Sequence, residues 1–291
     1  MRLSTVILPL ERSSFSIEKW RRAEALGFDS AYTYDHLYWL RLKDRPWFGA
    51  VPTLTAAALS TSNIRLGTLV TTPNFRHPVP LAKEIISLDD ISNGRLDIGV
   101  GSGGLGGDAS VLGETALTSR ERTDRFIEFV RLLDQLLRNE ETTFEGTFYS
   151  ARDARMLPGP LQQPRPPFLV AANSPRGMDV AAKYGQAWIT LGSSKRQPEA
   201  CIDAVSSQLA LLNEALVKVN RVSSDLDKVL LNGHLSDERP LESLDAFVDW
   251  AGRYGQIGIT ELVIHWPEPD SPFDTDMKVF EAIASDGLKQ L

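Results

Sequence analysis

The feature that most limits the fold of this chain is the alternation of two hydrophobic periods along nearly its whole length. Short apolar runs predict buried strands, and longer segments with apolar residues at i, i+3 and i+4 predict amphipathic helices. The predicted strands are Leu3–Leu8, Ala31–Tyr34, Ile64–Thr72, Leu96–Val100, Phe168–Ala172, Ala187–Thr190, Val229–His234 and Leu262–His265. The predicted helices are Ile17–Leu26, Val51–Ser60, Pro80–Ile91, Ser119–Arg138, Arg176–Tyr184, Pro198–Val219, Leu241–Tyr254 and Asp274–Ile283. Eight strands, each followed by a helix within 291 residues, predict a (β/α)8 TIM barrel.

One segment interrupts the alternation between the fourth helix and the fifth strand. Residues 139–167 contain a predicted small hairpin, Thr142–Tyr149, and then a proline-rich approach to the next strand. Too little chain lies on either side for two separate cores, so we interpret residues 1–291 as a single barrel domain with an excursion. The long fourth helix begins with a capping-box pattern, Thr118-Ser119-Arg120-Glu121.

Composition excludes several classes of protein and of binding partner. The chain is 42% hydrophobic and 24% charged, and we find no apolar run long enough to span a bilayer. Its net charge of -7 argues against nucleic-acid and acidic-membrane partners, which call for a basic face. A single cysteine, Cys201, excludes an intrachain disulfide, and the first ten residues read as a strand rather than a signal peptide. We therefore expect a cytoplasmic protein with a small-molecule ligand.

An acid and an imidazole follow the second predicted strand directly. Asp35-His36 stands at its C-terminal end, with Tyr38 and Trp39 just beyond. Ligands bind at that end of the strands in barrels, and histidine exchanges protons near neutral pH. The alternative interpretation is structural: Asp35 caps the following turn and His36 packs against Trp39.

A glycine-rich stretch follows the fourth predicted strand. Gly99-Val100-Gly101-Ser102-Gly103-Gly104 satisfies the G-x-G-x-x-G pattern, but Leu105-Gly106-Gly107-Asp108 prolongs the loop and no helix begins before about Ser119. Because a dinucleotide site needs a helix starting at the third glycine, we reject that interpretation. The glycines instead allow the backbone to approach a flat ring closely. A mobile surface loop is the alternative.

The fifth predicted strand leads into a candidate anion site. After Ala171 and Ala172, either Asn173 or Ser174 is placed to cap a helix that begins near Pro175. Backbone N–H groups at a helix start, helped by Arg176, favour a phosphate. Simple capping, without any ligand, explains the same residues equally well.

Taken together, several segments resemble the luciferase-like flavin and deazaflavin oxidoreductases. This superfamily includes bacterial luciferase, alkanesulfonate monooxygenase and enzymes that use coenzyme F420. The resemblance extends from the first helix to about residue 190, and no single motif in it is diagnostic. The matching stretches are Ala23-Glu24-Ala25-Leu26-Gly27-Phe28-Asp29, Asp35-His36, Ile64-Arg65-Leu66-Gly67-Thr68, Arg76-His77-Pro78, Ala82-Lys83-Glu84, Leu88-Asp89-Asp90-Ile91-Ser92-Asn93-Gly94-Arg95, the glycine-rich stretch, and Ala181-Ala182-Lys183-Tyr184-Gly185 before Trp188.

The resemblance implies roles for individual residues at the C-terminal mouth of the barrel. His36 matches the catalytic histidine and Asp35 the neighbouring acid that contacts the cofactor, while Leu69-Val70 matches a non-proline cis peptide. The cofactor would be bound by Leu69, Val70, Thr71, Thr72, Asn74, Gly101, Ser102, Gly103, Ala171, Ala172, Asn173, Ser174 and Gly177. Apart from the resemblance, we expect Trp39, Trp47, His265 and Trp266 to wall the substrate pocket, with His234 as a weaker candidate. A surface loop rich in aromatics explains Trp39 and Trp47 equally well. Where sugar dehydrogenases of this group carry a glutamate, Gly103-Gly104-Leu105 stands here.

The leading hypothesis is hydride transfer between coenzyme F420 and a small organic substrate, with His36 giving or taking the proton. The alternative is a reduced-FMN-dependent monooxygenase that acts through a flavin hydroperoxide, and a non-catalytic flavin-binding barrel ranks below both. A metal-dependent hydrolase is disfavoured, because the four histidines show no paired ligand spacing. A homodimer through Val51–Ser60 and Pro80–Ile91, and a separate reductase that supplies reduced cofactor, are further expectations.

Overall fold

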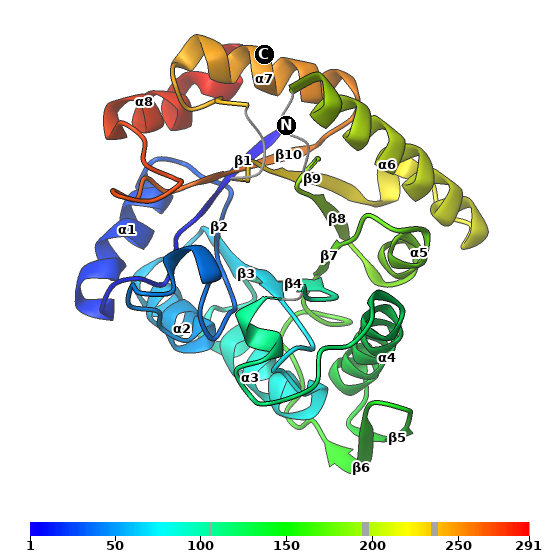
Figure 1. The fold of residues 1–291 in the computed structure, drawn as a ribbon. Coiled ribbons are helices and arrows are strands. Elements are labelled where there is room, and N and C mark those ends of the chain that lie inside the picture. Colours follow the sequence, from blue (N-terminus) through cyan, green and yellow to red (C-terminus); the bar gives the residue numbers. More distant parts are fainter. Residues whose placement is uncertain (105, 194–197, 234–237, 291) are drawn as a thin grey trace.

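The barrel is closed by eight parallel strands in the order β1-β10-β9-β8-β7-β4-β3-β2, as the computed structural model shows (Figure 1). The structure describes residues 1–104, 106–193, 198–233 and 238–290. Leu105 and His234 lie outside these ranges. Helices surround the barrel on the outside, and the (β/α)8 prediction is confirmed.

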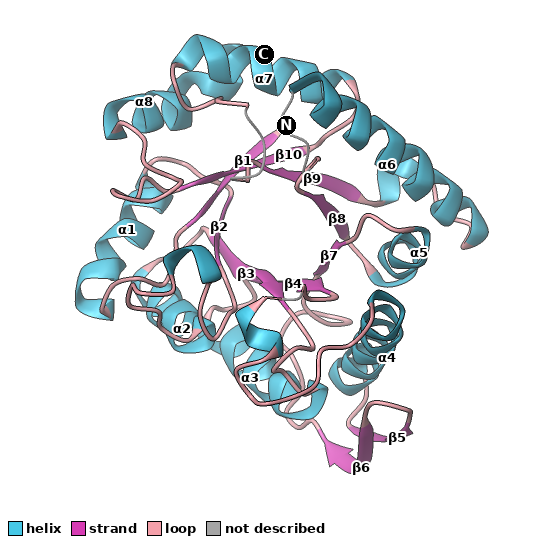
Figure 2. Cartoon of the chain, viewed as in Figure 1, coloured by secondary structure: helices cyan, strands magenta, loops and turns pink. Residues whose placement is uncertain are grey.

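The elements follow the predicted order with small changes at their ends (Figure 2). The barrel strands are β1 Arg2–Val6, β2 Ser30–Thr33, β3 Arg65–Thr71, β4 Leu96–Gly101, β7 Phe168–Ala171, β8 Ala187–Thr190, β9 Asp227–Leu231 and β10 Glu261–His265. The α-helices are α1 Ser13–Ala25, α2 Ala50–Ser60, α3 Pro78–Ile91, α4 Ser119–Arg138, α5 Pro175–Tyr184, α6 Pro198–Lys218, α7 Leu244–Gln256 and α8 Met277–Ala282.

Capping residues explain where several helices begin. Thr118 and Glu121 form the predicted capping box at α4. The last two helices begin later than predicted, because Ser243 caps α7 and Asp276 caps α8 through their side chains. Helix α1 instead begins earlier, at Ser13, without a side-chain cap.

Alternation along the strands separates two hydrophobic clusters. Residues that face the barrel axis, such as Val6, Leu169 and Val263, form an interior cluster with Tyr32 and Tyr34. Their neighbours in the sequence point outward and pack under the helices in a larger cluster. Strand parity therefore decides whether a side chain faces the barrel interior or the helices.

The N-terminal end of the barrel is closed by a network of charged side chains. Arg2 contacts the buried Glu261 at 2.8 Å and Asp227 at 2.7 Å, and Arg65 binds Asp97. Burial raises the pKa of the Asp97 carboxyl, although the Arg65 guanidinium opposes the shift. These groups therefore partner one another and stabilise the N-terminal end of the barrel.

The excursion forms a two-stranded antiparallel hairpin, β5 Glu141–Glu145 and β6 Ser150–Arg155, beyond the ring of helices beside α4 (Figure 1). The hairpin therefore runs further than the predicted Thr142–Tyr149. Glu128 of α4 fixes the turn, because its carboxylate accepts hydrogen bonds from the N–H groups of Thr147, Phe148 and Tyr149.

Helix α6 corrects one expectation from composition. By length and composition alone, its residues Ala200–Lys218 are apolar enough to cross a membrane, and no other helix of that length among the described residues is. In the structure this helix belongs to the ring around the barrel, and its inner face, including Val205 and Leu212, lies in the outer hydrophobic cluster. Cys201 is buried on the same helix, as predicted for a small apolar residue.

Candidate functional site

His36 lies at the C-terminal mouth of the barrel in contact with a buried aspartate. Its Nδ1 is 2.5 Å from Oδ2 of Asp108, which lies in the loop after β4. The other carboxylate oxygen of Asp108 accepts the Leu37 N–H at 2.8 Å. Asp108 is 4% exposed, so the two bonds replace its contacts with water. With the carboxylate as acceptor, His36 carries its proton on Nδ1 and presents a lone pair at Nε2.

The Asp35 side chain bonds to residues that follow and belong to β3, and not to the His36 ring. The Asp35 carboxylate receives two bonds from Arg76, at 2.7 and 3.0 Å, and one from the Thr71 hydroxyl at 2.6 Å. Because side chains alternate along β2, Tyr34 and His36 face the mouth while Asp35 faces the helices. Its carboxylate links the segment after β2 to β3 and to the segment that precedes α3.

Aromatic side chains surround His36 at the mouth. Trp47 donates its indole N–H to the His36 carbonyl at 2.9 Å, and the Tyr34 ring meets His36 edge-on. Trp39 contacts the edge of Tyr34 and stacks on Phe273. Trp47 therefore lies next to His36 and Trp39 next to Tyr34, and both remain partly exposed. That they wall a substrate pocket stays a prediction.

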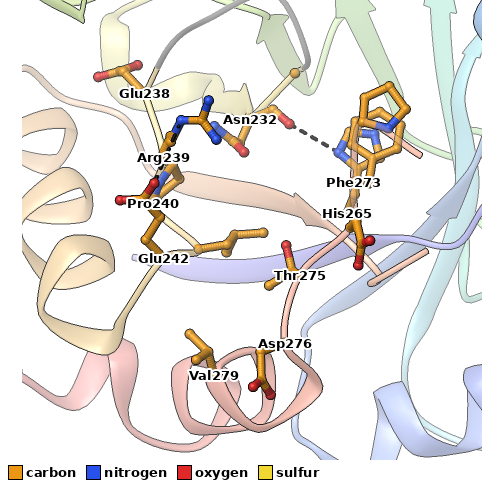
Figure 3. Close-up of a pocket in the computed structure, with 14 residues that line it drawn as sticks. Asn232, Glu238, Arg239, Pro240, Glu242, His265, Phe273, Thr275, Asp276 and Val279 are labelled. Atoms are coloured by element: carbon orange, nitrogen blue, oxygen red, sulfur yellow. Dashed lines mark hydrogen bonds and ion pairs between the residues drawn. The ribbon is translucent and has the colours of Figure 1, made fainter. Parts of the chain in front are cut away.

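His265 closes the aromatic group on the far side. Its Nε2 is 2.8 Å from the Tyr34 hydroxyl, its Nδ1 is 3.1 Å from the Asn232 carbonyl, and Phe273 stacks on the ring. Beyond this stack lies a cavity of about 530 Å³ between the loops that follow β9 and β10 (Figure 3). Trp266 points the other way and packs on Phe280 of α8, so its prediction as a pocket residue is wrong.

Strand β3 forms a bulge toward the mouth. The Leu69–Val70 peptide bond is cis, as the resemblance implied, and the register against β4 shifts between Thr68 and Thr71. A Cβ atom on Gly101 would lie 2.8 Å from a methyl group of Val70. The glycine therefore allows the bulge and β4 to approach, and Val70 stays half-buried at the mouth.

The polar residues after β3 support the glycine-rich loop. Asn74 is 5% exposed and donates to the Gly104 carbonyl at 3.1 Å, while Thr72 Oγ1 accepts the Asn74 N–H. Gly103 has a φ of +72° and packs on the Asn74 amide. The hydroxyl of Thr71 binds Asp35 and its side chain is buried, so the role of Thr71 in the cofactor wall stays a prediction. Ser102 is half-buried in the same loop.

The start of α5 has the predicted capping geometry. Ser174 accepts the Gly177 N–H at 3.3 Å, and Pro175 occupies the first turn. Ala171 belongs to the partly buried edge of the interior cluster, Ala172 packs against Gly177, and Asn173 is exposed. Arg176 forms an ion pair with Asp124 of α4, so its charge is already matched.

Sequence reasoning missed three residues of this site, namely Asp108, Tyr34 and Phe273. Tyr34 could have been predicted from the sequence, because the alternation of side chains along a strand places it on the same side as His36. Asp108 and Phe273 lie in irregular loops, where no period indicates the direction of a side chain.

Comparison with known proteins shows the family to which the chain belongs. The family model described as luciferase-like monooxygenase matches residues 13–224. The chain belongs to the luciferase-like monooxygenase family. An F420-dependent glucose-6-phosphate dehydrogenase of Beutenbergia cavernae is 34% identical over 78% of the chain and 66% of its own length. A 4-hydroxyprotoasukamycin monooxygenase of Streptomyces nodosus is 29% identical over 81% of the chain and 64% of its own length. The matched part thus covers less than two thirds of either relative.

Solved structures share the fold of this luciferase-like chain. The F420-dependent tetrahydromethanopterin reductase of Methanopyrus kandleri superimposes with a TM-score of 0.77, with 19% identity over 99% of both chains. An F420-dependent secondary alcohol dehydrogenase gives a TM-score of 0.79, with 17% identity, over 98% of the chain and 99% of its own. At these identities the likeness establishes the barrel fold alone.

Proposed function

We propose that this protein transfers a hydride between coenzyme F420 and a small organic substrate, with His36 as the group that exchanges the proton. The observation that carries the proposal is the contact of His36 with Asp108 at the barrel mouth. Relatives that are named as F420-dependent enzymes support the choice of cofactor.

The residues at the mouth suit a flat tricyclic ring. Val70 and Ala171 are partly buried apolar side chains there, and Gly101 and Gly103 leave the adjacent wall without side chains. Apolar surface with small residues accommodates a ring face, and the N-terminus of α5 favours an anionic group. A bound deazaflavin supplies a ring carbon that accepts or donates a hydride.

The protein itself contributes orientation and proton transfer. Asp108 holds the proton of His36 on Nδ1, so Nε2 is free to accept the proton of a substrate hydroxyl when its carbon is oxidised. In the reverse direction the same nitrogen returns the proton. Trp39 and Trp47 limit the access of water to His36 from the loop that follows β2.

A second candidate is oxygen-dependent monooxygenation with reduced FMN. The similarity to the monooxygenase of Streptomyces nodosus favours it, and a separate reductase would then supply the reduced cofactor. The same mouth residues would hold either ring, so the choice depends on which cofactor binds.

An equilibrium titration of the purified apoprotein with F420 and with FMN, followed by fluorescence, tests the proposal. Micromolar or tighter binding of F420 alone, followed by substrate-dependent bleaching of its absorbance, is the expected result. Preferential binding of FMN, with oxygen consumption after reduction, would replace hydride transfer by monooxygenation.

The assembly and location of the protein are part of the proposal. We propose a cytoplasmic homodimer in which apolar side chains on the outer faces of α2 and α3 meet. Leu59 is 75% exposed and Ile91 is 38% exposed on these helices. Analytical ultracentrifugation of the protein and of its Leu59→Glu variant tests the interface. We expect the protein to sediment as a dimer and the variant as a monomer.

A further inference from the structure

A second cavity borders Asn74 and the residues that follow it, outside the lining of the first. It has a volume of about 370 Å³, and its walls come from the segments that follow β3 and β4, from α4 and from the hairpin turn. Leu112, Leu117 and Phe148 give it apolar walls, and Arg125 supplies a guanidinium group. This combination of apolar walls and a cation is typical of a site for an amphiphilic anion.

The guanidinium of Arg125 bonds to a neutral amide, that of Asn74, rather than to a carboxylate. Its Nη2 donates to Oδ1 of Asn74 at 2.6 Å, and its Nε is buried without a hydrogen-bond partner. No carboxylate of the described residues forms an ion pair with it. A guanidinium group that has no carboxylate partner favours an anionic ligand, because a charge-assisted hydrogen bond is stronger than one to a neutral amide.

Two neutral side chains supply donors beside Arg125, while the nearby carboxylate of Glu128 is bound by the N–H groups of the hairpin turn. His77 accepts the Val79 N–H at Nδ1, so its Nε2 carries a proton, and its ring meets Tyr149 edge-on. Burial lowers the pKa of His77 and raises that of Tyr149, so both remain neutral hydrogen-bond donors near neutral pH. Arg76 is already neutralised by Asp35 and Glu84. Glu114 is the one acid in the lining, and it is exposed.

We propose that this cavity binds an organic carboxylate, with the Arg125 guanidinium as its ion-pair partner. Among the described residues, none that contacts His36 lines this cavity, so ligand binding to it is measured without turnover. Asn74 connects the two places, because it receives Arg125 on one side and holds the Gly104 carbonyl on the other. The carboxylate belongs either to a separate small molecule or to the acidic side chain of the cofactor.

Calorimetric titration of the apoprotein with benzoate, and with benzamide as the neutral isostere, tests the site. Saturable binding of benzoate but not of benzamide is expected. Arg125→Gln, which removes the charge and keeps a polar side chain, should weaken benzoate binding by about tenfold or more. Arg131→Gln removes the same charge from an exposed position on α4 and should leave the affinity unchanged.

Competition separates the two sources of the carboxylate. Displacement of benzoate by F420, but not by its tail-less chromophore, assigns the site to the cofactor side chain, and simultaneous binding assigns it to a separate ligand. Equal affinities of benzoate and benzamide, or an unchanged affinity in a folded Arg125→Gln, would overturn the proposal. If Arg125→Gln does not fold, Arg125→Lys takes its place. Lysine keeps the charge but lacks the paired N–H groups of the guanidinium, so undiminished benzoate binding in this variant would count against the site.

Discussion

His36 and Asp108 are 72 positions apart in the chain, yet their side chains meet at 2.5 Å. The contact joins the loop after β2 to the loop after β4 across the barrel mouth. Asp108 is held by a second bond from the Leu37 N–H, and Tyr38 packs on Gly107, where a Cβ atom would lie 2.1 Å from its ring. The acid is therefore fixed on both sides before any ligand binds, which is the arrangement that orients a proton-transferring imidazole.

Replacement of Asp108 by asparagine should abolish most of the activity. The new side chain would keep an oxygen for the Leu37 N–H and turn its amide N–H toward His36, which moves the imidazole proton to Nε2. We expect kcat/KM to fall by about 100-fold or more with F420 affinity unchanged. Nitrogen-15 spectra of the histidines should show the change of tautomer. An unchanged tautomer with parallel losses of Tm and F420 affinity would mean that Asp108 is only structural.

Replacement of His36 by alanine tests the proton transfer itself. We expect kcat to fall by about 10²–10⁴-fold, because the variant lacks the nitrogen that exchanges the proton with the substrate. His77→Ala is the matched control, since His77 lies outside the mouth and caps α3. Turnover that survives largely intact in His36→Ala would remove His36 from the mechanism.

The barrel and its strand order were accessible from the sequence because each element carries its own period. Strand parity also contains the information that Tyr34 and His36 share a face and that Asp35 lies on the other. The adjacency of Asp35 and His36 in the sequence concealed this alternation. Helix starts shifted where short polar side chains, such as Ser243 and Asp276, cap the first turn.

The remaining features depend on irregular backbone. The bulge in β3 breaks the alternation between Thr68 and Thr71, so parity no longer indicates that Thr71 turns toward Asp35. Asp108 follows a glycine-rich loop that shows no hydrophobic period. Its contact with His36, 72 positions earlier in the chain, forms only when the barrel closes. Arg125 looks like an ordinary surface cation on an amphipathic helix until its surroundings are known.

Replacement of Asp35 by asparagine should affect stability rather than chemistry. The buried carboxylate receives two bonds from Arg76 and one from Thr71, and its loss leaves Arg76 with Glu84 alone. We expect the free energy of unfolding in urea to fall by ~2–3 kcal/mol. Activity per folded molecule should persist. A large fall in kcat without loss of stability would instead support the role implied by the family resemblance.

The stability of the protein should decrease at mildly acidic pH because of His77. Burial lowers the pKa of its imidazole below 6.5, so the unfolded chain binds more protons than the folded one between that lowered pKa and 6.5. The free energy of unfolding therefore rises with pH through this window, and the contribution of His77 to stability is lost as the pH falls through it. In His77→Asn, which retains a capping side chain, Tm should depend less on pH over the same interval. An identical slope in both proteins would assign the effect to another group.

Two glycines of the same loop region should respond differently to alanine. In Gly101→Ala the new methyl group would lie 2.8 Å from Val70 and push the bulge of β3 out of place. We expect a loss of ~1–3 kcal/mol in stability and a weaker affinity for the cofactor, because Val70 borders the proposed ring site. Gly106 has a φ of -72° and open space around it, so Gly106→Ala should keep both properties. Equal cofactor affinity in the two variants would show that the ring does not rest on the bulge, and the cofactor would then have to be sought elsewhere at the mouth.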